Sequence, residues 1–286
     1  MSPRRPRSPG TLHRSERITA ILESLSTGGT VHVGQLAERF GVSPSTLRRD
    51  LALLEQQRLL ARTHGGALAR DVPYELPVRY RDGHQRDEKR AIALAAVQRI
   101  PAGPVAIGLT GGTTTSEVAR AITDRPRLTV VTNALNIAMD LAMRPRIKVI
   151  VTGGVARPQS YELVGPFAEQ SLARINLGLA LIGVDGISAD GGLTTHDEIE
   201  AHTNQEMIRR AQRVIVVADG TKVGRVLLAH IAPLSDVDEL ITTGTADQAA
   251  LAAIRRAGVA VHVAPDTPPP APVRTTPDGS AATPTA

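Results

Sequence analysis

The chain has 286 residues, a length for one large domain or two ordinary ones, and its lack of cysteine excludes disulfides, cysteine-ligated zinc, iron–sulfur clusters and thiol nucleophiles. Two Phe, three Tyr and no Trp are too few for a protein that stacks single-stranded nucleic acid on aromatic side chains. Residues 1–70 hold 11 Arg and no Lys against five acidic residues, whereas residues 71–286 hold 22 basic and 23 acidic residues, so the excess positive charge predicts a polyanionic partner such as nucleic acid in the first quarter.

The two ends of the chain are rich in residues that disfavour a packed core. Residues 1–13 are rich in Pro, Arg and Ser, and residues 265–286 contain seven prolines, so we expect two disordered tails, the first of them basic. The first ten residues lack the apolar core of a secretory signal, and no apolar stretch approaches the ~20 residues of a membrane-spanning helix. The sequence therefore predicts a soluble, cytoplasmic protein.

Residues 14–69 are predicted to form a helical domain. Apolar residues recur at the spacing of one helix face in three successive segments. They are Ile18, Ile21, Leu22 and Leu25, then Val33, Leu36, Ala37 and Phe40, then Leu47, Leu51 and Leu54. Gly41 is predicted to end the second helix in a left-handed conformation, and Ser43 to cap the third, with Pro44 at its first position. Two helices joined by such a short turn form a helix-turn-helix unit.

The outer face of the third helix carries side chains suited to DNA. With the cap residue they are Ser43, Ser45, Thr46, Arg48 and Arg49. In a helix-turn-helix unit the N-terminal half of this helix enters the major groove, where Arg bridges guanine O6 and N7 and Ser or Thr reaches a phosphate or a base edge. We assign Arg49, with Ser45 and Thr46, to the DNA-facing side. Arg48 instead reaches a phosphate or pairs with Glu55.

Residues 59–67, LLARTHGGA, follow the third helix and are predicted to form a short β-hairpin, or wing. Arg62 and His64 would lie beside the DNA backbone. Asp50 would repel phosphate if it faced the DNA, so we expect it to make an internal ion pair, for which Arg62 is a candidate. A three-helix protein–protein module with solvated arginines is the alternative to a DNA-binding domain.

Residues 70–87 are predicted to form a linker, and residues 88–264 an alternation of strands and helices. Apolar runs predict strands at 105–109, 128–132, 149–152, 179–184, 214–218, 240–243 and 259–263. Amphipathic patterns predict helices at 88–100, 116–122, 134–142, 200–211 and 246–257. Continuous apolar runs are typical of strands buried on both faces, so this part is predicted to be an α/β domain with a mainly parallel sheet and helices on both sides.

Polar residues and glycines follow several of these strands at their carboxyl ends, where open α/β sheets bind ligands. The segment 110–115, TGGTTT, offers the N–H groups of a loop and of a helix N-terminus to a phosphate, although it matches neither GxxxxGK[ST] nor GxGxxG. A tight turn capped by threonine is the alternative. The residues expected to surround one anionic ligand are Gly111, Gly112, Thr113, Thr114, Thr115, Asn133, Gly153, Gly154, Asp185 and Lys222.

Lys222 draws attention because the chain uses 30 Arg and only three Lys. A compact ammonium group suits contact with a phosphate or a carboxylate, so a chain that prefers Arg but keeps Lys at a strand end suggests a ligand there. A lone solvated lysine on the surface is the alternative.

Both halves of the chain resemble the DeoR family of bacterial transcriptional regulators. The segment 14–69, with FGVSPSTLRRDLALLEQQRLLARTHGGAL inside it, resembles the family's DNA-binding domain. The runs GGTTTSEVA, VVTNALNIA, LIGVDGISADGGLTT and RVIVVADGTKVGR resemble its sensor domain, which is similar in fold to ribose-5-phosphate isomerase. The resemblance covers residues 14 to about 245 and implies a winged helix-turn-helix domain, with the helix-turn-helix motif at 31–50, followed by an α/β sensor domain.

The resemblance also implies a phosphorylated sugar or polyol as effector. It places Gly112, Thr113 and Thr114 at the phosphate, and Asn133, Asp185 and Lys222 around the sugar. The chain departs from the family's usual pattern at three positions. His32 stands near where the family has a Ser or Thr cap, Gly34 is unusual in a first helical turn, and Thr110 stands where Asp is common.

Two functions remain open. One is a repressor of sugar or carbohydrate metabolism genes that binds operator DNA as a homo-oligomer, a dimer or larger, and releases it when a sugar phosphate binds. The other is a sugar-phosphate isomerase-like enzyme, for which Glu198, Glu206, Asp185 and Lys222 are candidate acid–base groups. A metabolic isomerase has no use for an operator-reading helix, so we expect a regulator associated with the nucleoid in the bacterial cytoplasm, with no enzymatic activity, cofactor or metal.

Overall fold

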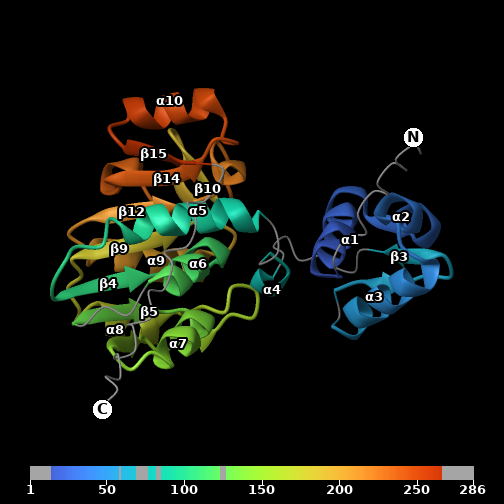
Figure 1. The fold of residues 1–286 in the computed structure, drawn as a ribbon, viewed down its shortest axis with the longest axis horizontal. Helices are drawn as coiled ribbons and strands as arrows, with labels where there is room; N and C mark the ends of the chain where they lie inside the picture. The colour runs from blue at the N-terminus through green and yellow to red at the C-terminus, as the bar shows by residue number, and fades with distance from the viewer. Residues whose placement is uncertain (1–13, 58, 69–76, 82–84, 123–126, 266–286) are drawn as a thin grey trace, which may run out of the picture.

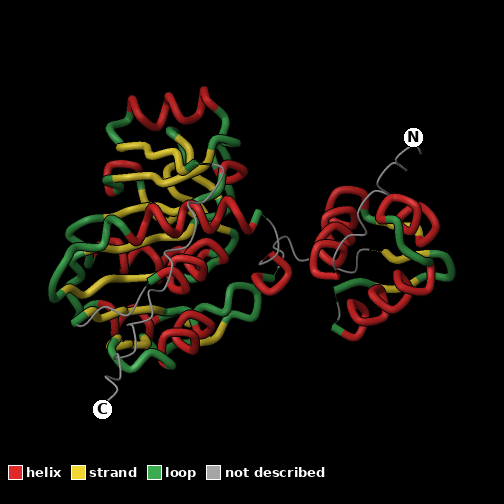
Figure 2. Tube along the Cα trace, in the orientation of Figure 1, coloured by secondary structure: helices red, strands yellow, loops and turns green. Residues whose placement is uncertain are grey.

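The computed structural model describes most of the chain (Figure 1). The described residues are 14–57, 59–68, 77–81, 85–122 and 127–265. The tail predicted at 1–13 lies outside them, as does the tail predicted at 265–286 apart from its first residue. Among these residues no helix is both long and apolar enough to cross a bilayer. Figure 2 shows two parts, a small N-terminal domain of mainly helices and a larger domain built around a sheet.

The described part of the N-terminal domain consists of three helices and a small antiparallel sheet. These elements are α1 (Arg14–Gly28), β1 (Thr30–His32), α2 (Val33–Phe40), α3 (Pro44–Gln56), β2 (Ala61–Arg62) and β3 (Gly66–Leu68). Every apolar position predicted for the three helices is buried, and all of them share one core. The helical spacing of those residues therefore corresponds to real packing faces.

The turn between α2 and α3 follows the predicted caps. Gly41 has a φ of 63°, the left-handed conformation that glycine adopts most readily. The Ser43 side chain accepts a hydrogen bond from the Thr46 N–H at 3.2 Å, and Pro44 occupies the first helical position. His32 precedes α2 without a side-chain capping bond, which agrees with the departure noted at that position.

The wing is tied to the helices by a strand that the sequence does not reveal. β3 is the central strand and pairs with β2 on one side and with β1 on the other, both antiparallel. β1 was missed because three residues between two helices are too short to show a period-2 pattern. A Cβ on Gly66 would lie 1.8 Å from the Val31 carbonyl oxygen, so the close approach of β3 to β1 requires glycine there. The Val33 N–H also donates to the Gly65 carbonyl oxygen at 2.9 Å.

The C-terminal domain is built around a seven-stranded parallel sheet. In spatial order its strands are β15 (Ala260–Ala264), β14 (Glu239–Thr243), β12 (Val214–Val217), β9 (Leu179–Gly183), β4 (Val105–Leu109), β5 (Leu128–Thr132) and β6 (Ile147–Val151). Each lies at a run predicted to be a strand. The chain moves outward from β4 to β5 and β6, and then crosses to β9 on the other side of β4. The direction of winding therefore changes between β4 and β9, which is where open sheets of this kind bind ligands.

Helices cover both faces of this sheet, as the apolar strands predict. One core joins α5 (Arg86–Val97), α6 (Thr113–Ala121) and α7 (Leu135–Ala142) to the sheet, and the other joins α8 (Pro166–Leu172), α9 (Glu198–Arg209) and α10 (Gln248–Arg256). In β9, Leu179 and Leu181 belong to the first core, whereas Ala180 and Ile182 belong to the second. The strand is apolar throughout because both of its faces are buried.

Several short elements of the C-terminal domain are not predicted from the sequence. They are α8, an antiparallel sheet of β10 (Gly186–Ser188), β11 (Gly192–Thr195) and β13 (Ala229–Ala232), the pair β7 (Val155–Ala156) and β8 (Leu163–Val164), and the 3-10 turns η1 (Gly220–Lys222) and η2 (Leu234–Asp236). Two to seven residues carry too little periodicity to be recognised alone. The α/β class with a mainly parallel sheet is nevertheless confirmed.

One short helix lies within the segment predicted to be a linker. It is α4 (Val78–Arg81), which Figure 1 shows between the two domains. Tyr80 is buried against the core of the N-terminal domain. The Val78 N–H donates to the Gln159 carbonyl oxygen of the C-terminal domain at 2.7 Å. The linker thus contains a turn of helix that contacts both domains.

Candidate functional site

The outer face of α3 presents the predicted DNA-binding side chains. Ser45, Arg48 and Arg49 are exposed, while Leu47 on the inner face is fully buried. The Ser43 hydroxyl lies 2.8 Å from the Ser45 hydroxyl and 2.9 Å from that of Thr46, so the hydroxyls at the start of the helix bond to one another. The two arginines are exposed basic groups of this helix, which suits contact with phosphates and base edges.

Asp50 makes the internal ion pair that the sequence predicts, but with a different partner. Its carboxylate lies 2.6 Å from Nε of Arg17 on α1, and both side chains are more than 90% buried. Arg14 approaches Asp50 to 3.5 Å from a largely exposed position. Arg62 was the wrong candidate because it lies on β2, beside Glu55. The pair with Arg17 fastens α1 to the middle of α3.

The wing carries Arg62 and His64 on its exposed surface. Arg62 binds Glu55 twice, since its N–H donates to Oε1 at 3.1 Å and its guanidinium lies 3.6 Å from Oε2. Glu55 is therefore engaged by the wing, which removes the partner suggested for Arg48. Both groups of the Arg62–Glu55 pair are about 40% exposed, so water screens the pair and a phosphate can compete for Arg62.

A cavity of about 470 Å³ opens at the carboxyl ends of β4, β9 and β12, at the switch point of the sheet. Its lining includes the predicted residues Gly111, Gly112, Thr113, Thr114, Asp185 and Lys222. It also includes residues that were not predicted, among them Arg81, Lys89, Glu162, His196, Glu200, Asp219 and Arg225. Segments from both sides of the switch point thus form one pocket, as the ends of the predicted strands suggest.

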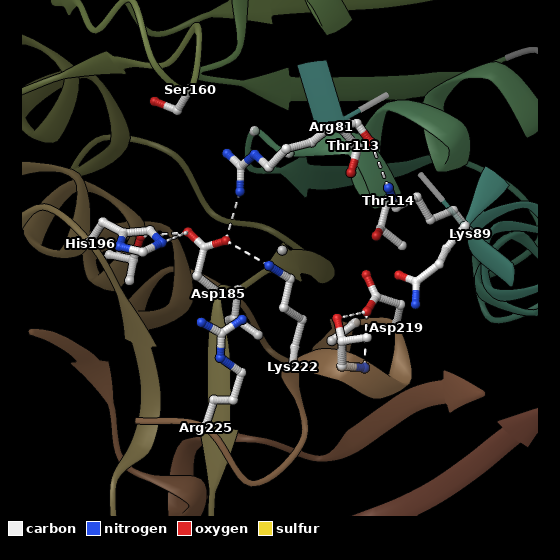
Figure 3. A pocket seen from close by; sticks show the side chains of 18 of the residues that line it. Arg81, Lys89, Thr113, Thr114, Ser160, Asp185, His196, Asp219, Lys222 and Arg225 are labelled. Atoms are coloured by element: carbon white, nitrogen blue, oxygen red, sulfur yellow. Dashed lines mark hydrogen bonds and ion pairs between the residues drawn. The ribbon is translucent and has the colours of Figure 1, made fainter. Parts of the chain in front are cut away.

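Asp185, directly after β9, is the centre of a charge cluster in this pocket (Figure 3). Its Oδ1 lies 2.8 Å from Nη1 of Arg81 and 3.2 Å from Nζ of Lys222. Its Oδ2 accepts a hydrogen bond from the Thr195 hydroxyl at 3.2 Å, and His196 lies 4.0 Å away. Burial alone would raise the pKa of Asp185, but the charges of Arg81, Lys222 and His196 outweigh it and hold that pKa well below its usual range.

Lys222 is not a solvated surface lysine, since its side chain is only 20% exposed and it points into the pocket. Asp219 fixes the turn that carries it, because its carboxylate accepts from the Thr221 N–H at 3.0 Å and from the Thr221 hydroxyl. Lys89, from α5, lines the same pocket and donates to the Arg81 carbonyl oxygen at 2.9 Å. Two of the three lysines of the chain therefore lie at this pocket. The rarity that pointed to Lys222 would also have pointed to Lys89, whereas Arg81 has no local signal.

The loop after β4 is held by a buried carboxyl group. The Gly111 N–H donates to Oε1 of Glu162 at 2.6 Å, and a Cβ on Gly111 would lie 2.5 Å from that oxygen. The amides of Asn133 and Asn204 donate to Oε2 of Glu162, each at 3.2 Å. Burial raises the pKa of Glu162 well above its usual 4.5, and the carboxylate of Glu200 raises it further. The Gly111 N–H is thus engaged by protein, so this donor of the predicted phosphate loop is already used.

Four predicted ligand residues lie outside this cavity. Thr115 and Asn133 are fully buried behind its wall, where the Thr115 hydroxyl bonds to the Gly112 carbonyl oxygen at 3.1 Å. Gly153 and Gly154 line a separate recess beside Phe167. They follow β6, the edge strand, which is two strands away from β4. The pattern after β6 resembles that after β4, but the strand order places it elsewhere.

Thr110, one of the three positions that depart from the family pattern, joins two strand ends here. Thr110 is fully buried, and its hydroxyl accepts a hydrogen bond from the Gly183 N–H at 2.9 Å, so it joins the ends of β4 and β9. Of the acidic residues considered for an isomerase, Glu206 pairs with Arg210 at 2.6 Å. Neither Glu206 nor Glu198 lines the described cavity, and Asp185 is neutralised by two cations.

Comparison with known proteins agrees with this arrangement. The chain matches a model of the DeoR-like helix-turn-helix domain over residues 17–71 and a model of the DeoR C-terminal sensor domain over residues 84–244. It is 37% identical over 250 residues to a putative aga operon transcriptional repressor of Escherichia coli O157:H7, covering 86% of this chain and 93% of that protein. It is 32% identical over 231 residues to the glycerol-3-phosphate regulon repressor of Escherichia coli K12, covering 81% and 91%.

A solved ribose 5-phosphate isomerase A of Methanocaldococcus jannaschii is also similar, with a TM-score of 0.37 and 17% identity over 50% of this chain and 55% of that chain. This score is low and describes a partial likeness in chain path. The two DeoR family models, by contrast, each match one of the two domains, and the alignments to the two repressors span 81–86% of this chain. The chain therefore belongs to the DeoR family of transcriptional regulators.

Proposed function

We propose that this protein is a repressor of sugar or carbohydrate metabolism genes that releases operator DNA when a phosphorylated sugar or polyol enters the pocket at the switch point. It would act as a homo-oligomer at the nucleoid in the bacterial cytoplasm, because helix-turn-helix proteins usually read two half-sites with two copies. The observation that carries the proposal is a pocket with four basic side chains and a helix N-terminus in its wall, in the same chain as an exposed, arginine-bearing helix.

The basic side chains of the pocket and the helix N-terminus in its wall support an anionic effector. Four basic residues line the pocket beside four acidic ones, and α6 begins in its wall at Thr113. The basic residues are Arg81, Lys89, Lys222 and Arg225, and the acidic ones are Glu162, Asp185, Glu200 and Asp219. The N–H groups of a first helical turn have no partner within the helix, and the helix dipole adds partial positive charge there. The raised pKa of Glu162 favours its neutral form, which lessens repulsion of a phosphate at this end.

The names of two relatives support a sugar-related ligand. One of them is named for the glycerol-3-phosphate regulon and another for the aga operon. A cavity of about 470 Å³ has room for a molecule of that size. In this proposal the carboxyl and hydroxyl groups of Asp185, Thr195 and Glu200 bind sugar hydroxyls, and the basic residues bind the phosphate.

Two measurements test the proposal. A duplex selected by the full-length protein from a random pool serves as operator in gel shifts, and thermal denaturation reports ligand binding. Millimolar glycerol 3-phosphate or hexose 6-phosphates should raise the melting temperature and change operator affinity, and a ligand at a hundredfold excess over Kd adds about 2.7 kcal/mol. Equal shifts with the unphosphorylated parent compounds would refute a phosphate site, and failure to select any duplex would refute operator binding.

A further inference from the structure

The helix α4 is held by both domains at once. The Tyr80 side chain is 9% exposed in the core of the N-terminal domain, and its carbonyl oxygen accepts a hydrogen bond from the Thr19 hydroxyl of α1. From the other side, Val78 bonds through its N–H to Gln159 of the C-terminal domain at 2.7 Å. A displacement of this turn relative to the C-terminal domain must therefore act on the packing of α1.

The residue after Tyr80 reaches the effector pocket. Figure 3 shows the Arg81 guanidinium pointing toward Asp185, opposite Lys222. The Nη1–Oδ1 distance is 2.8 Å, and the Arg81 side chain is 20% exposed. The Arg81 carbonyl oxygen accepts the hydrogen bond from Lys89 at 2.9 Å, so a second basic group of the pocket also holds α4. Even Thr19 of the N-terminal domain lines the same cavity.

An anion in this pocket would change the charges around Arg81. Asp185 is shared between Arg81 and Lys222. A guanidinium presents five N–H donors in a planar fork whose geometry matches both carboxylate and phosphate. Arg81 can therefore divide its hydrogen bonds between Asp185 and an incoming phosphate. A ligand that bonds to Arg81 acts on α4 directly, because Arg81 belongs to that helix. A ligand that bonds to Lys89 acts on α4 through the hydrogen bond from Lys89 to the Arg81 carbonyl oxygen.

We propose that Arg81 is a direct ligand of the effector's anionic group and that α4, through Tyr80, conveys occupancy of the pocket to the DNA-binding domain. The inference rests on the proposed function for the identity of the ligand. Allosteric coupling requires that the effector bind two arrangements of the protein unequally, and Arg81 is the group through which the pocket distinguishes two positions of α4.

The first test compares variants of the full-length protein. Calorimetry measures binding of inorganic phosphate, glycerol 3-phosphate and hexose 6-phosphates, and gel shifts on the selected duplex measure the response. Arg81→Ala should weaken binding of the phosphorylated probe by about tenfold or more, since it removes a charged hydrogen bond. It should also reduce the effector's change in operator affinity, expected at about tenfold in the wild type, to less than about twofold. Arg90→Ala, an exposed arginine of α5, is the matched control and should change neither.

A variant at Tyr80 distinguishes binding of the effector from transmission of its effect to the DNA-binding domain. Tyr80→Ala removes the side chain that packs α4 into the N-terminal core, so it should bind the phosphorylated probe as the wild type does but lose the change in operator affinity. Its operator affinity without effector verifies that the DNA-binding domain is folded. A wild-type effector response in either Arg81→Ala or Tyr80→Ala would overturn the proposal.

A second test needs no effector and distinguishes failure of the coupling from failure of the proposed function. Hydrogen exchange of the apo protein should be faster across α1 in Arg81→Ala than in the wild type, because α4 is then released from Asp185, and Arg90→Ala should show no change. If the wild type binds none of the phosphorylated probes, the proposed function fails while this measurement still decides the coupling. Unchanged exchange of α1 in Arg81→Ala would overturn the link between pocket and DNA-binding domain.

Discussion

Asp50→Ala should destabilise the N-terminal domain by about 3–5 kcal/mol, the usual cost of removing one partner from a buried ion pair. Asp50 is 2% exposed and its partner Arg17 is 6% exposed, with 2.6 Å between the charged atoms, so the substitution leaves a buried guanidinium without this carboxylate. Whole domains are stable by about 5–15 kcal/mol, so the loss is a large share of the total. The same carboxylate lies 3.5 Å from Arg14, whose side chain is 64% exposed, and Arg14→Ala should cost less than about 1 kcal/mol.

Hydrogen exchange over a urea series measures the opening free energy of α3 amides separately from that of the C-terminal domain. The pair Asp50→Ala and Arg14→Ala should differ by at least about 2 kcal/mol, since the two sites differ mainly in burial. The double variant Asp50→Leu with Arg17→Met should recover most of the loss, because it removes both buried charges together. Equal effects of Asp50→Ala and Arg14→Ala would refute the view that burial makes this pair important.

Three further predictions concern function and pH. Arg49→Ala should cost about 1–3 kcal/mol of binding free energy on the selected duplex but little on a scrambled one. Arg62→Ala should weaken binding to both duplexes alike and lower by about one the slope of the logarithm of affinity against the logarithm of salt concentration. Gel shifts over a salt series measure both effects, and equal effects of Arg49→Ala on the two duplexes would contradict a base contact. Lys222→Ala should abolish the effector response and keep operator binding without effector, and a variant that responds at an unchanged effector concentration would remove Lys222 from the site. Because the folded-state pKa of Glu162 is raised, its contribution to stability is fully present below pH 4.5 and is lost as pH rises through the folded pKa. Glu162→Gln should therefore gain melting temperature relative to the wild type as pH rises above 4.5, and a difference that does not vary with pH would contradict the shift.

The fold could be predicted from the sequence wherever a pattern is local. β4 and β5 begin and end at the predicted residues, because apolar runs between polar ends show directly which strands are buried on both faces. The cap at Ser43 and the left-handed Gly41 follow from residue type for the same reason.

Long-range contacts are what the sequence could not supply. The Asp50–Arg17 pair joins residues 33 positions apart, and the Arg81–Asp185 pair joins residues 104 positions apart. No spacing rule links such residues, so Arg62 was an equally reasonable partner for Asp50. Gly153 failed as a pocket residue for a related reason, since the order of strands in a sheet depends on crossovers that leave no mark on the individual strand.

The scarcity of lysine has a practical consequence for spectroscopy. Lys89 and Lys222 line the pocket, whereas Lys148 lies exposed on β6, far along the sheet. Reductive methylation with carbon-13 formaldehyde would label three lysine side chains besides any free α-amino group, two that should respond to a ligand and one that serves as an internal reference. Because lysine is rare in this chain, the methyl signals of Lys89 and Lys222 would report directly on the pocket. Candidate effectors can then be screened one by one without any knowledge of the operator.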